Sequence, residues 1–396
     1  MLEAAIRGGR RYWTLVCCLL AVIGVGVAAY LYQFKIGLGV TGMSRDVSWG
    51  LYIGQFTFLV GVAASGVMVV LPYYLHNHKA FGRITVLGEF LAIAAVIMCM
   101  LFIFVDLGQP LRVLNVILHP TPNSVMFYDM LVLSGYLFLN VLVGWTVLGA
   151  ERKGIPSPSW VKPFIIISIA WAPSIHTVTA FLYAGIPGRH LWLTAIMAAR
   201  FLASAFSGGP SLLLILALIL RKYTKFDPGK QAIQTLAKII TYFLITSVFF
   251  LGLEFFTAFY SHIPGHTLPL IYLYKGLDGH SKLVPIMWAS SILAVIALIL
   301  LVPPKFRKNE TLLTIGCVAT FLSLWIEKGF GLIIGGFVPN PFEGVTEYWP
   351  TLPETFIALG VWAIGFLVLT LLYKTAVTVK EEAVFDKYGE RQIKTE

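Results

Sequence analysis

Several ionisable residues stand inside long apolar runs of this 396-residue sequence, and four of them are Asp129, His176, Arg200 and Glu254. Carboxylates and imidazole are the groups that most often give and take protons in proteins. Within an apolar run such groups are costly, and they usually mark a functional site. We therefore expect these four residues to form a proton relay in a polar cavity.

The composition indicates where such a cavity would lie. Hydrophobic residues make up 58% of the chain and charged residues only 12%, with a mean hydropathy of +0.82. A soluble protein has about twice that share of charged residues. The composition therefore excludes a soluble enzyme, a disordered chain and a nucleic-acid-binding protein, and it indicates a chain embedded in a lipid bilayer.

Ten apolar runs are long enough to cross a bilayer, which takes about 20 residues in a helix. Because the runs are continuous rather than alternating, they exclude a transmembrane β-barrel. The sequence thus predicts an all-α integral membrane protein, with residues 1–396 forming one polytopic domain. The transmembrane helices are expected at residues 13–33, 50–74, 86–106, 125–149, 163–185, 191–221, 236–260, 284–302, 310–336 and 355–374. We expect Gly208, Gly209 and Pro210 to interrupt the sixth helix.

The distribution of basic residues predicts the orientation. If the N-terminus is inside, 20 of the 29 Lys and Arg residues face the cytoplasm. Cytoplasmic loops of membrane proteins carry such an excess. We therefore expect a multi-pass protein of the cytoplasmic membrane with both termini in the cytoplasm, and a charged C-terminal tail at residues 375–396. The net charge of +10 then reflects topology.

This topology gives the four ionisable residues similar depths. Counted from the outer ends of their helices at 1.5 Å per residue, they lie about 6 to 14 Å below the outer surface. Residues at similar depths on different helices can meet inside a bundle. A structural alternative also fits: Arg200 would form an ion pair with Glu254, and Glu327 would extend toward the membrane surface beside Lys328.

A second set of polar and aromatic residues lies near the outer ends of the first helices. It comprises Trp49, Tyr52, Gln55, Asp106 and Tyr128. Aromatic residues at this height commonly form the belt at a membrane surface. Together with a carboxylate, they would also suit a flat aromatic ligand that exchanges protons.

The sequence predicts no metal site in this chain. The four Cys residues lie in apolar runs without C-x-x-C spacing, which argues against structural zinc, a c-type haem and an iron–sulfur cluster. Of the eight His residues, only His176 lies well within a predicted helix. A membrane haem takes paired axial ligands from the core of a bundle. We therefore expect no haem either.

Several segments, in their order along the chain, resemble the NrfD/PsrC family of quinone-interacting membrane subunits. Residues 106–110, DLGQP, followed by Asn123 and Ser124, resemble its DLGxP…NxS signature. Segments around Trp49, His176 and Arg200 are also similar, as are those at 254–260 and 325–329. Ten helices rather than eight, together with residues 41–50, are most similar to the DsrP branch, which belongs to complexes linked to dissimilatory sulfur and sulfite metabolism.

The resemblance implies a quinone-oxidoreductase subunit of a larger respiratory complex, with menaquinone or menaquinol as an exchangeable cofactor near the periplasmic face. It implies a periplasmic iron–sulfur protein as the electron-transfer partner, besides a multihaem cytochrome c and further membrane and cytoplasmic subunits. Helices two to five and six to nine would form two four-helix bundles, flanked by the first and tenth. The residues implied around the quinone are Trp49, Tyr52, Asp106, Tyr128, Asp129 and His176, with Gln55 and His119 as additions; Arg200 and Glu254 would belong to a proton path.

Three other functions fit the sequence. An ion- or proton-coupled secondary transporter also has many helices, broken spans and buried charges. A structural anchor would explain the partners but not the deep charges. A proton pump driven by quinone chemistry would share the same site, and Glu89 near the inner end could connect it to the cytoplasm. A transporter would accumulate its substrate alone in vesicles, whereas an electron-transfer subunit would copurify with its redox partners.

Overall fold

The computed structural model describes residues 3, 5 and 8–393, with side chains up to residue 381. These residues form helices and no strand, and ten of the helices are long and apolar enough to cross a membrane. Each overlaps one of the ten predicted runs, so the predicted fold class is confirmed. The charged tail expected from residue 375 continues the last helix as far as Ile393. Residues 394–396 of that tail lie outside the described residues.

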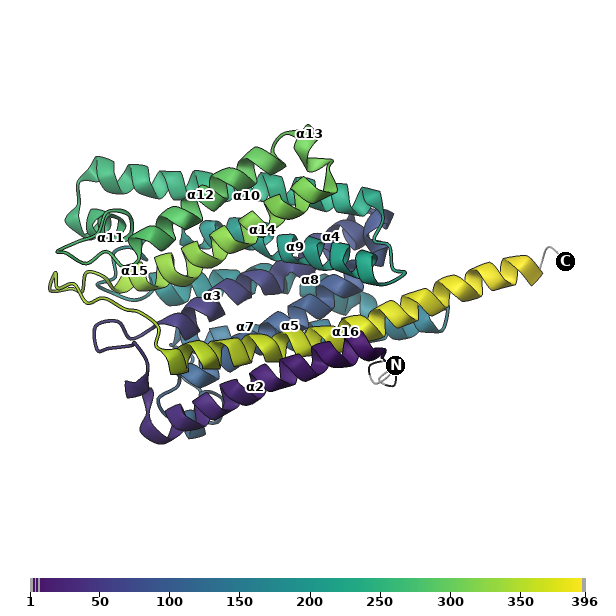
Figure 1. Ribbon diagram of the computed structural model, residues 1–396, viewed down its shortest axis with the longest axis horizontal. Helices are drawn as coiled ribbons and strands as arrows, with labels where there is room; N and C mark the ends of the chain where they lie inside the picture. Colours follow the sequence, from purple (N-terminus) through teal and green to yellow (C-terminus); the bar gives the residue numbers. More distant parts are fainter. Residues whose placement is uncertain (1–2, 4, 6–7, 394–396) are drawn as a thin grey trace.

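The helices follow one another with short connections (Figure 1). The membrane-crossing elements are α2 (Arg10–Ile36), α3 (Leu51–Ala63) with η2 (Ala64–Gly66) and α4 (Val67–Leu75), α5 (Thr85–Asp106), α7 (Val125–Arg152), α8 (Val161–Ala184), α9 (Met197–Tyr223), α10 (Lys230–Ser261), α12 (Val284–Leu301), α14 (Glu310–Ile326) with η5 (Glu327–Leu332) and α15 (Ile333–Phe337), and α16 (Leu352–Ile393). Shorter helices lie between them: α6 (Asn115–Leu118), α11 (Pro264–Tyr274) and α13 (Pro304–Arg307).

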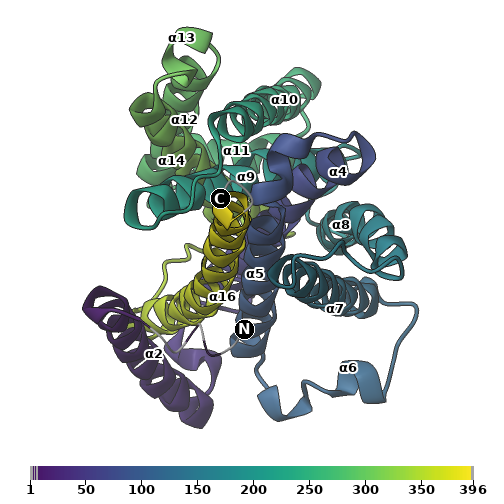
Figure 2. The ribbon, with the colours of Figure 1, turned by 90° about the vertical axis from the view of Figure 1, so that its right-hand side faces the viewer.

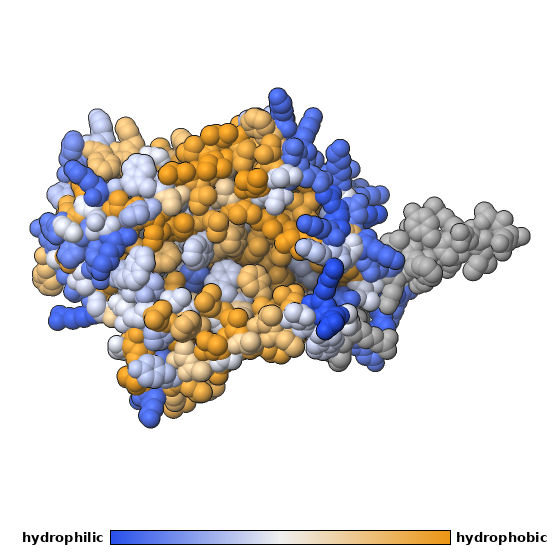
Figure 3. All heavy atoms as spheres, viewed as in Figure 1, coloured by the Kyte–Doolittle hydropathy of each residue, from blue (hydrophilic) through white to orange (hydrophobic). Residues whose placement is uncertain are grey.

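The two ends of the molecule differ. We call the end formed by residues 37–50, 107–124, 185–196, 262–283 and 338–351 the loop-rich end, and the end formed by residues 76–84, 153–160, 224–229 and 302–309 the basic end. The helix α2 begins and α16 ends at the basic end (Figure 1). A belt of apolar side chains separates the two hydrophilic ends (Figure 3). Exposed residues of this kind, such as Leu31 and Ile299, need contact with lipid. The chain is therefore a multi-pass integral membrane protein.

Seen along the helices, α3/α4, α5, α7 and α8 gather on one side, and α9, α10, α12 and α14 on the other (Figure 2). We call these the first and second helix groups. The helices α2 and α16 pack against each other, and α16 also packs against α5. The helix α9 contacts α3 and α8 as well as α10 and α14, so the two groups share an interface. The division into two separate bundles stays a prediction.

The predicted interruption of the sixth helix is wrong. The helix α9 runs without a break from Met197 to Tyr223, with Pro210 inside it. Its glycines serve close packing: a Cβ added to Gly209 would lie 2.9 Å from the carbonyl oxygen of Gly61. Neighbouring helices that pack this tightly can hold a Pro-containing turn in helical form. The helix also starts later than predicted, because residues 185–196 form turns.

The irregular segments lie in two other helices. The 3₁₀ turn η2 separates α3 from α4, and the π-helical segment η5 separates α14 from α15. The segment η5 is held against α3 at close range, since a Cβ added to Gly54 would lie 2.4 Å from the carbonyl oxygen of Gly329. This backbone contact joins the two helix groups directly beside Glu327 and Lys328.

Replacing Gly54 with alanine is expected to lower the free energy of unfolding by about 1–3 kcal/mol, the usual cost of overpacking a filled site. The added methyl group would collide with the Gly329 backbone. The control is Gly252→Ala on α10, where an added Cβ meets nothing within 4 Å in the described part of the chain. Denaturant unfolding in detergent would compare the two. Equal losses of stability would contradict the close contact of α3 with η5.

Candidate functional site

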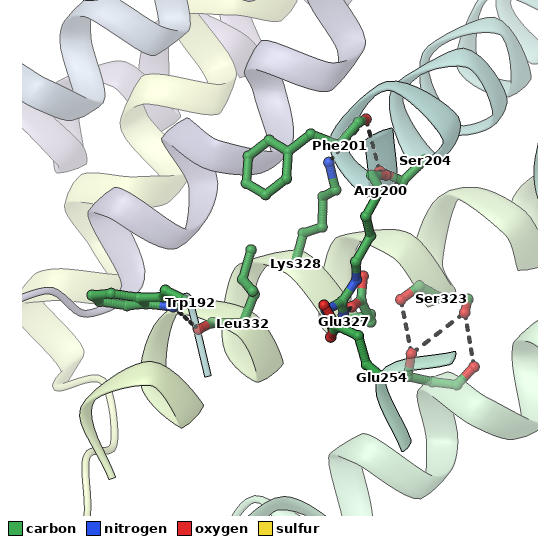
Figure 4. A network of polar contacts seen from close by, with 10 residues as sticks. Trp192, Arg200, Phe201, Ser204, Glu254, Ser323, Glu327, Lys328 and Leu332 are labelled. Carbon is green, nitrogen blue, oxygen red and sulfur yellow. Dashed lines mark hydrogen bonds and ion pairs between the residues drawn. The ribbon is translucent and has the colours of Figure 1, made fainter. Parts of the chain in front are cut away.

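An ion triad ties together three helices of the second group. The guanidinium of Arg200 on α9 donates through Nη1 to Glu254 on α10 and through Nη2 to Glu327 at the start of η5. Figure 4 shows the three side chains converging. Arg200 is only 6% exposed. The planar guanidinium can donate to two carboxylates at once, and these charge-assisted hydrogen bonds offset the cost of burying its charge.

The triad tests the two structural pairings that the sequence suggests. Arg200 does pair with Glu254, whereas the pairing of Glu327 with Lys328 at the membrane surface is wrong. Adjacent helical residues do not face each other. Glu327 turns to Arg200, and Lys328 extends away from it toward Phe201 (Figure 4). Both side chains are buried, so neither reaches a surface.

A small, partly open cavity of about 30 Å³, which has room for one or two water molecules, lies beside the triad between α9, α10, α12 and α14. Arg200 and Glu327 form part of its wall. Hydroxyl groups from three helices also line it: Ser247, Ser290, Ser291 and Ser323. Serine hydroxyls both donate and accept hydrogen bonds, so such a wall can hold water next to the charged groups.

The first helix group buries a carboxylate and an imidazole. Asp129 on α7 is 3% exposed, and its Oδ1 accepts a hydrogen bond from Thr179 Oγ1 at 2.7 Å. His176 lies one turn earlier on α8, where it is fully buried. Neither ring nitrogen of His176 has a hydrogen-bond partner among the described residues. Buried polar atoms are nearly always paired, so these nitrogens need a water or a ligand.

Nearer the loop-rich end, a chain of hydrogen bonds connects α2, α3 and α5. Tyr52 donates to Gln33 Oε1 at 2.7 Å, and Gln33 Nε2 donates to the carbonyl oxygen of Val105 at 2.7 Å. The next residue, Asp106, has one carboxylate oxygen buried without a partner in the described structure. Sequence reasoning did not single out Gln33, although a glutamine in an apolar run is a signal of such a role.

Gln55 is a hydrogen-bond donor of fixed orientation. Its Oε1 accepts from the indole nitrogens of Trp325 at 2.7 Å and Trp362 at 2.9 Å. These two bonds distinguish the oxygen of the amide from its nitrogen. Its Nε2 is therefore held in place as a donor, and within the described residues it is buried without an acceptor.

The other residues predicted to surround a ligand, Trp49, Tyr128 and His119, differ in how deeply they are buried. Trp49 is half buried, and its ring packs edge-on against Tyr183 and Phe337 with centroids 5.8 Å away in each case. It thus belongs to an interior aromatic cluster. Tyr128 is 45% exposed, and His119 is exposed in the loop after α6. The structure does not bring these two together with the buried polar residues.

Sequence reasoning also missed Glu354, a fully buried carboxylate at the start of α16. It accepts hydrogen bonds from the backbone nitrogens of Gly42 at 3.0 Å and Leu51 at 3.2 Å, and from the hydroxyl of Tyr348. Burial and then the Glu354 charge raise the pKa of Tyr348 well above its usual range, so this hydroxyl stays a donor. The T-x-x-E spacing from Thr351, typical of a capping box, is the signal that predicts it.

In the part of the chain that the structure describes, no three His, Cys, Asp or Glu side chains gather closely enough to hold a metal ion. What the site offers is proton exchange and hydrogen bonding. Asp129 and His176 can accept protons, and Gln55 can donate to a carbonyl oxygen.

Comparison with known proteins finds one family model and several relatives that match most of the chain. A family model described as polysulphide reductase, NrfD, matches residues 39–339. The chain is 23% identical to a selenate reductase subunit of Mesobacillus selenatarsenatis, over 96% of each chain. It is 21% identical to the Hdr-like menaquinol oxidoreductase integral membrane subunit of Archaeoglobus fulgidus, over 94% of this chain and 95% of that one. It is 20% identical to the menaquinone reductase integral membrane subunit of Nitratidesulfovibrio vulgaris, over 92% and 91% respectively.

Replacing Arg200 with methionine is expected to cost about 3–5 kcal/mol of stability, because two buried carboxylates would lose their counter-charge. The control is Arg221→Met, also on α9. Arg221 pairs with Glu310 of α14, but the two side chains are 30% and 45% exposed. Exposed pairs contribute at most about 1 kcal/mol. Unfolding in detergent would compare both variants, and a similar loss for both would show that the triad is not a buried charge network.

Proposed function

Because this chain belongs to the polysulphide reductase family NrfD, we propose that it is the quinone-handling membrane subunit of a multi-subunit oxidoreductase. The family match confirms the resemblance found in its sequence motifs. Two relatives matched along more than nine tenths of their length are named as a menaquinol oxidoreductase subunit and a menaquinone reductase subunit. We extend their quinone chemistry to this chain, with menaquinone as the exchangeable cofactor.

The observation that carries this proposal is the set of buried polar atoms without partners in the first helix group. They are Oδ1 of Asp106, Nε2 of Gln55 and both ring nitrogens of His176, all within the described residues. A quinone head group has two carbonyl oxygens that accept hydrogen bonds, and as quinol two hydroxyls that donate them. It therefore matches a site that offers both free donors and free acceptors.

Quinol oxidation releases two electrons and two protons, so the site must accept protons. Asp129 is the first acceptor in our proposal, because it is a buried carboxylate and, among the described residues, only the hydroxyl of Thr179 donates to it. His176 is the second proton acceptor. It lies on α8, one helical turn before Thr179. Gln55 orients the head group through its fixed amide nitrogen, and the aromatic cluster around Trp49 excludes water from one side.

The sidedness is also part of the proposal. The short connections of the basic end carry Lys and Arg, which supports placing this end and both termini in the cytoplasm and the loop-rich end in the periplasm. An iron–sulfur protein would then bind the loop-rich end, where Leu111, Leu114 and Leu118 are exposed around α6. We include a multihaem cytochrome c, further subunits and a role in sulfur or sulfite metabolism in the proposal, because residues 41–50 resemble the DsrP branch.

The second helix group supplies a proton path in this proposal. Arg200 and Glu254 lie in the triad next to the serine-lined cavity, where water could carry protons onward. Glu89 lies near the basic end of α5, is 3% exposed, and has one carboxylate oxygen without a partner in the described structure. It is the residue best placed to continue such a path toward the basic end, which would make proton translocation possible.

The same cavity favours a second candidate function, ion- or proton-coupled transport. Transporters bind their substrates in polar cavities between helices near the middle of the membrane. Vesicles containing only this chain distinguish the two functions. Substrate accumulation by the isolated chain would support a transporter, whereas copurification with redox subunits and inhibition by quinone analogues would support the quinone role.

Replacing Asp129 with asparagine is expected to slow quinol oxidation about 10-fold or more, because the amide cannot accept the proton. Assembly is expected to persist, since asparagine has the same shape and can still accept from Thr179. The measurement is the oxidation of menadiol, a soluble naphthoquinol, by the intact complex.

The matched control is Asp227→Asn, which removes an exposed carboxylate at the basic end. Its rate should equal that of the wild-type complex. Unchanged turnover in Asp129→Asn would remove Asp129 from the mechanism.

A further inference from the structure

We infer that the proposed site binds the quinol in preference to the oxidised quinone, and that Gln33 on α2 is the positioning residue that sets this preference. The inference rests on the proposed function and deepens it by naming the redox form that the site selects. Gln33 lies before residues 39–339, which the family model matches. The sequence motifs give it no role either.

Gln33 differs from the rest of its helix. The helix α2 lies at the edge of the molecule beside α16, and most of its side chains are exposed (Figures 1 and 2). Its buried residues are Val16, Gly26 and Gln33. Val16 is apolar, and Gly26 allows close packing, since a Cβ added to it would lie 2.6 Å from the Cα of Gly360. Gln33 is polar and only 3% exposed, and a buried amide needs partners.

The two partners of Gln33 fix the direction of both hydrogen bonds. Its Nε2 donates at 2.7 Å to the carbonyl oxygen of Val105 on α5, which can only accept. The amide oxygen Oε1 therefore faces Tyr52 on α3, and this oxygen also can only accept. The hydroxyl of Tyr52 must give its one proton to Gln33, at 2.7 Å. Only the lone pairs of the Tyr52 oxygen remain, so toward a ligand Tyr52 is an acceptor.

Other polar atoms meet at the same end of α5. Tyr30 lies three residues before Gln33 on α2, and its ring packs against Phe104 with centroids 5.7 Å apart. Its hydroxyl is buried without a partner among the described residues, as is Oδ1 of Asp106, the residue after Val105. Buried polar atoms without partners indicate a ligand or water. The Tyr30 hydroxyl can rotate, so it can serve either redox form of a quinone.

The fixed direction at Tyr52 separates the two redox forms. A quinol hydroxyl has a proton to donate to the Tyr52 oxygen, whereas a quinone carbonyl has none and would face lone pairs with its own lone pairs. Buried acceptors left unpaired in this way are costly. Gln55, three residues later on α3, offers a fixed donor from which both forms can accept. The site therefore gains a hydrogen bond with the quinol that it lacks with the quinone, which suits uptake of quinol and release of the oxidised product.

The test measures how tightly the intact complex binds menadiol and its oxidised form, menadione. Equilibrium dialysis gives both dissociation constants, under anaerobic reducing conditions for menadiol and oxidising conditions for menadione. We expect the wild-type complex to bind menadiol about 10-fold more tightly, the effect of one buried hydrogen bond.

The decisive variant is Gln33→Met, which removes the acceptor that holds the Tyr52 proton. The hydroxyl can then donate to a quinone oxygen, so menadione should bind about 10-fold more tightly while menadiol changes little. A merely structural role would give no gain in affinity. Gln33→Glu keeps an oxygen that accepts from Tyr52, and it should keep the wild-type preference.

Two further variants complete the design. Tyr52→Phe removes the acceptor itself, so it should weaken menadiol binding and leave menadione binding unchanged; it decides the question if Gln33→Met does not assemble. The matched control is Gln234→Met on α10, whose Nε2 donates to the carbonyl oxygen of Arg307 at 3.3 Å near the basic end. Both dissociation constants should stay within about twofold, because this residue shares no partner with the site.

Four results would overturn the inference and leave the proposed function standing. They are equal or tighter binding of menadione by the wild-type complex, no gain in menadione affinity in Gln33→Met, loss of the preference in Gln33→Glu, and equal losses for both forms in Tyr52→Phe. A wild-type complex that binds neither form would overturn the proposed function and, with it, this inference.

Discussion

A charged side chain inside a membrane must find its partners within the protein, and this constraint determines how the chain is arranged. The guanidinium of Arg200 is matched by carboxylates from α10 and η5, so three helices must converge at one depth. Glu354 imposes the same requirement at the loop-rich end, where it joins α16 to the start of α3. Buried groups that have no such partner among the described residues, above all His176, identify the place where a ligand or water must bind.

The interface between the helix groups carries one ionisable side chain with a charged partner, Glu327, and one without such a partner among the described residues, Lys328. The close contact of Gly54 with Gly329 holds η5 against α3, and on that short segment Glu327 faces the triad while Lys328 donates to the carbonyl oxygen of Phe201 on α9. A quinone site on one side and a hydrated charge network on the other would thus share one rigid element.

The sequence predicted the parts of this structure that depend on local properties. Hydropathy identified all ten spans, and the rise of a helix placed Arg200 and Glu254 at depths where they could meet. The direction of Lys328 could not be predicted, since it depends on a π-helical turn stabilised by packing against α3. The interruption predicted at Gly208–Gly209–Pro210 is wrong because close packing against α3, which the sequence does not show, keeps α9 continuous. Burial separated Asp129 from its neighbour Tyr128, a distinction that requires knowing which face of α7 packs inward.

The most direct test of the account is an electron cryomicroscopy map of the intact complex prepared with a menaquinone analogue. The account predicts head-group density among α3, α5, α7 and α8, within hydrogen-bond distance of Asp129 or His176. Density for the head group only in the serine-lined cavity beside Arg200, or only outside the first helix group, would contradict it.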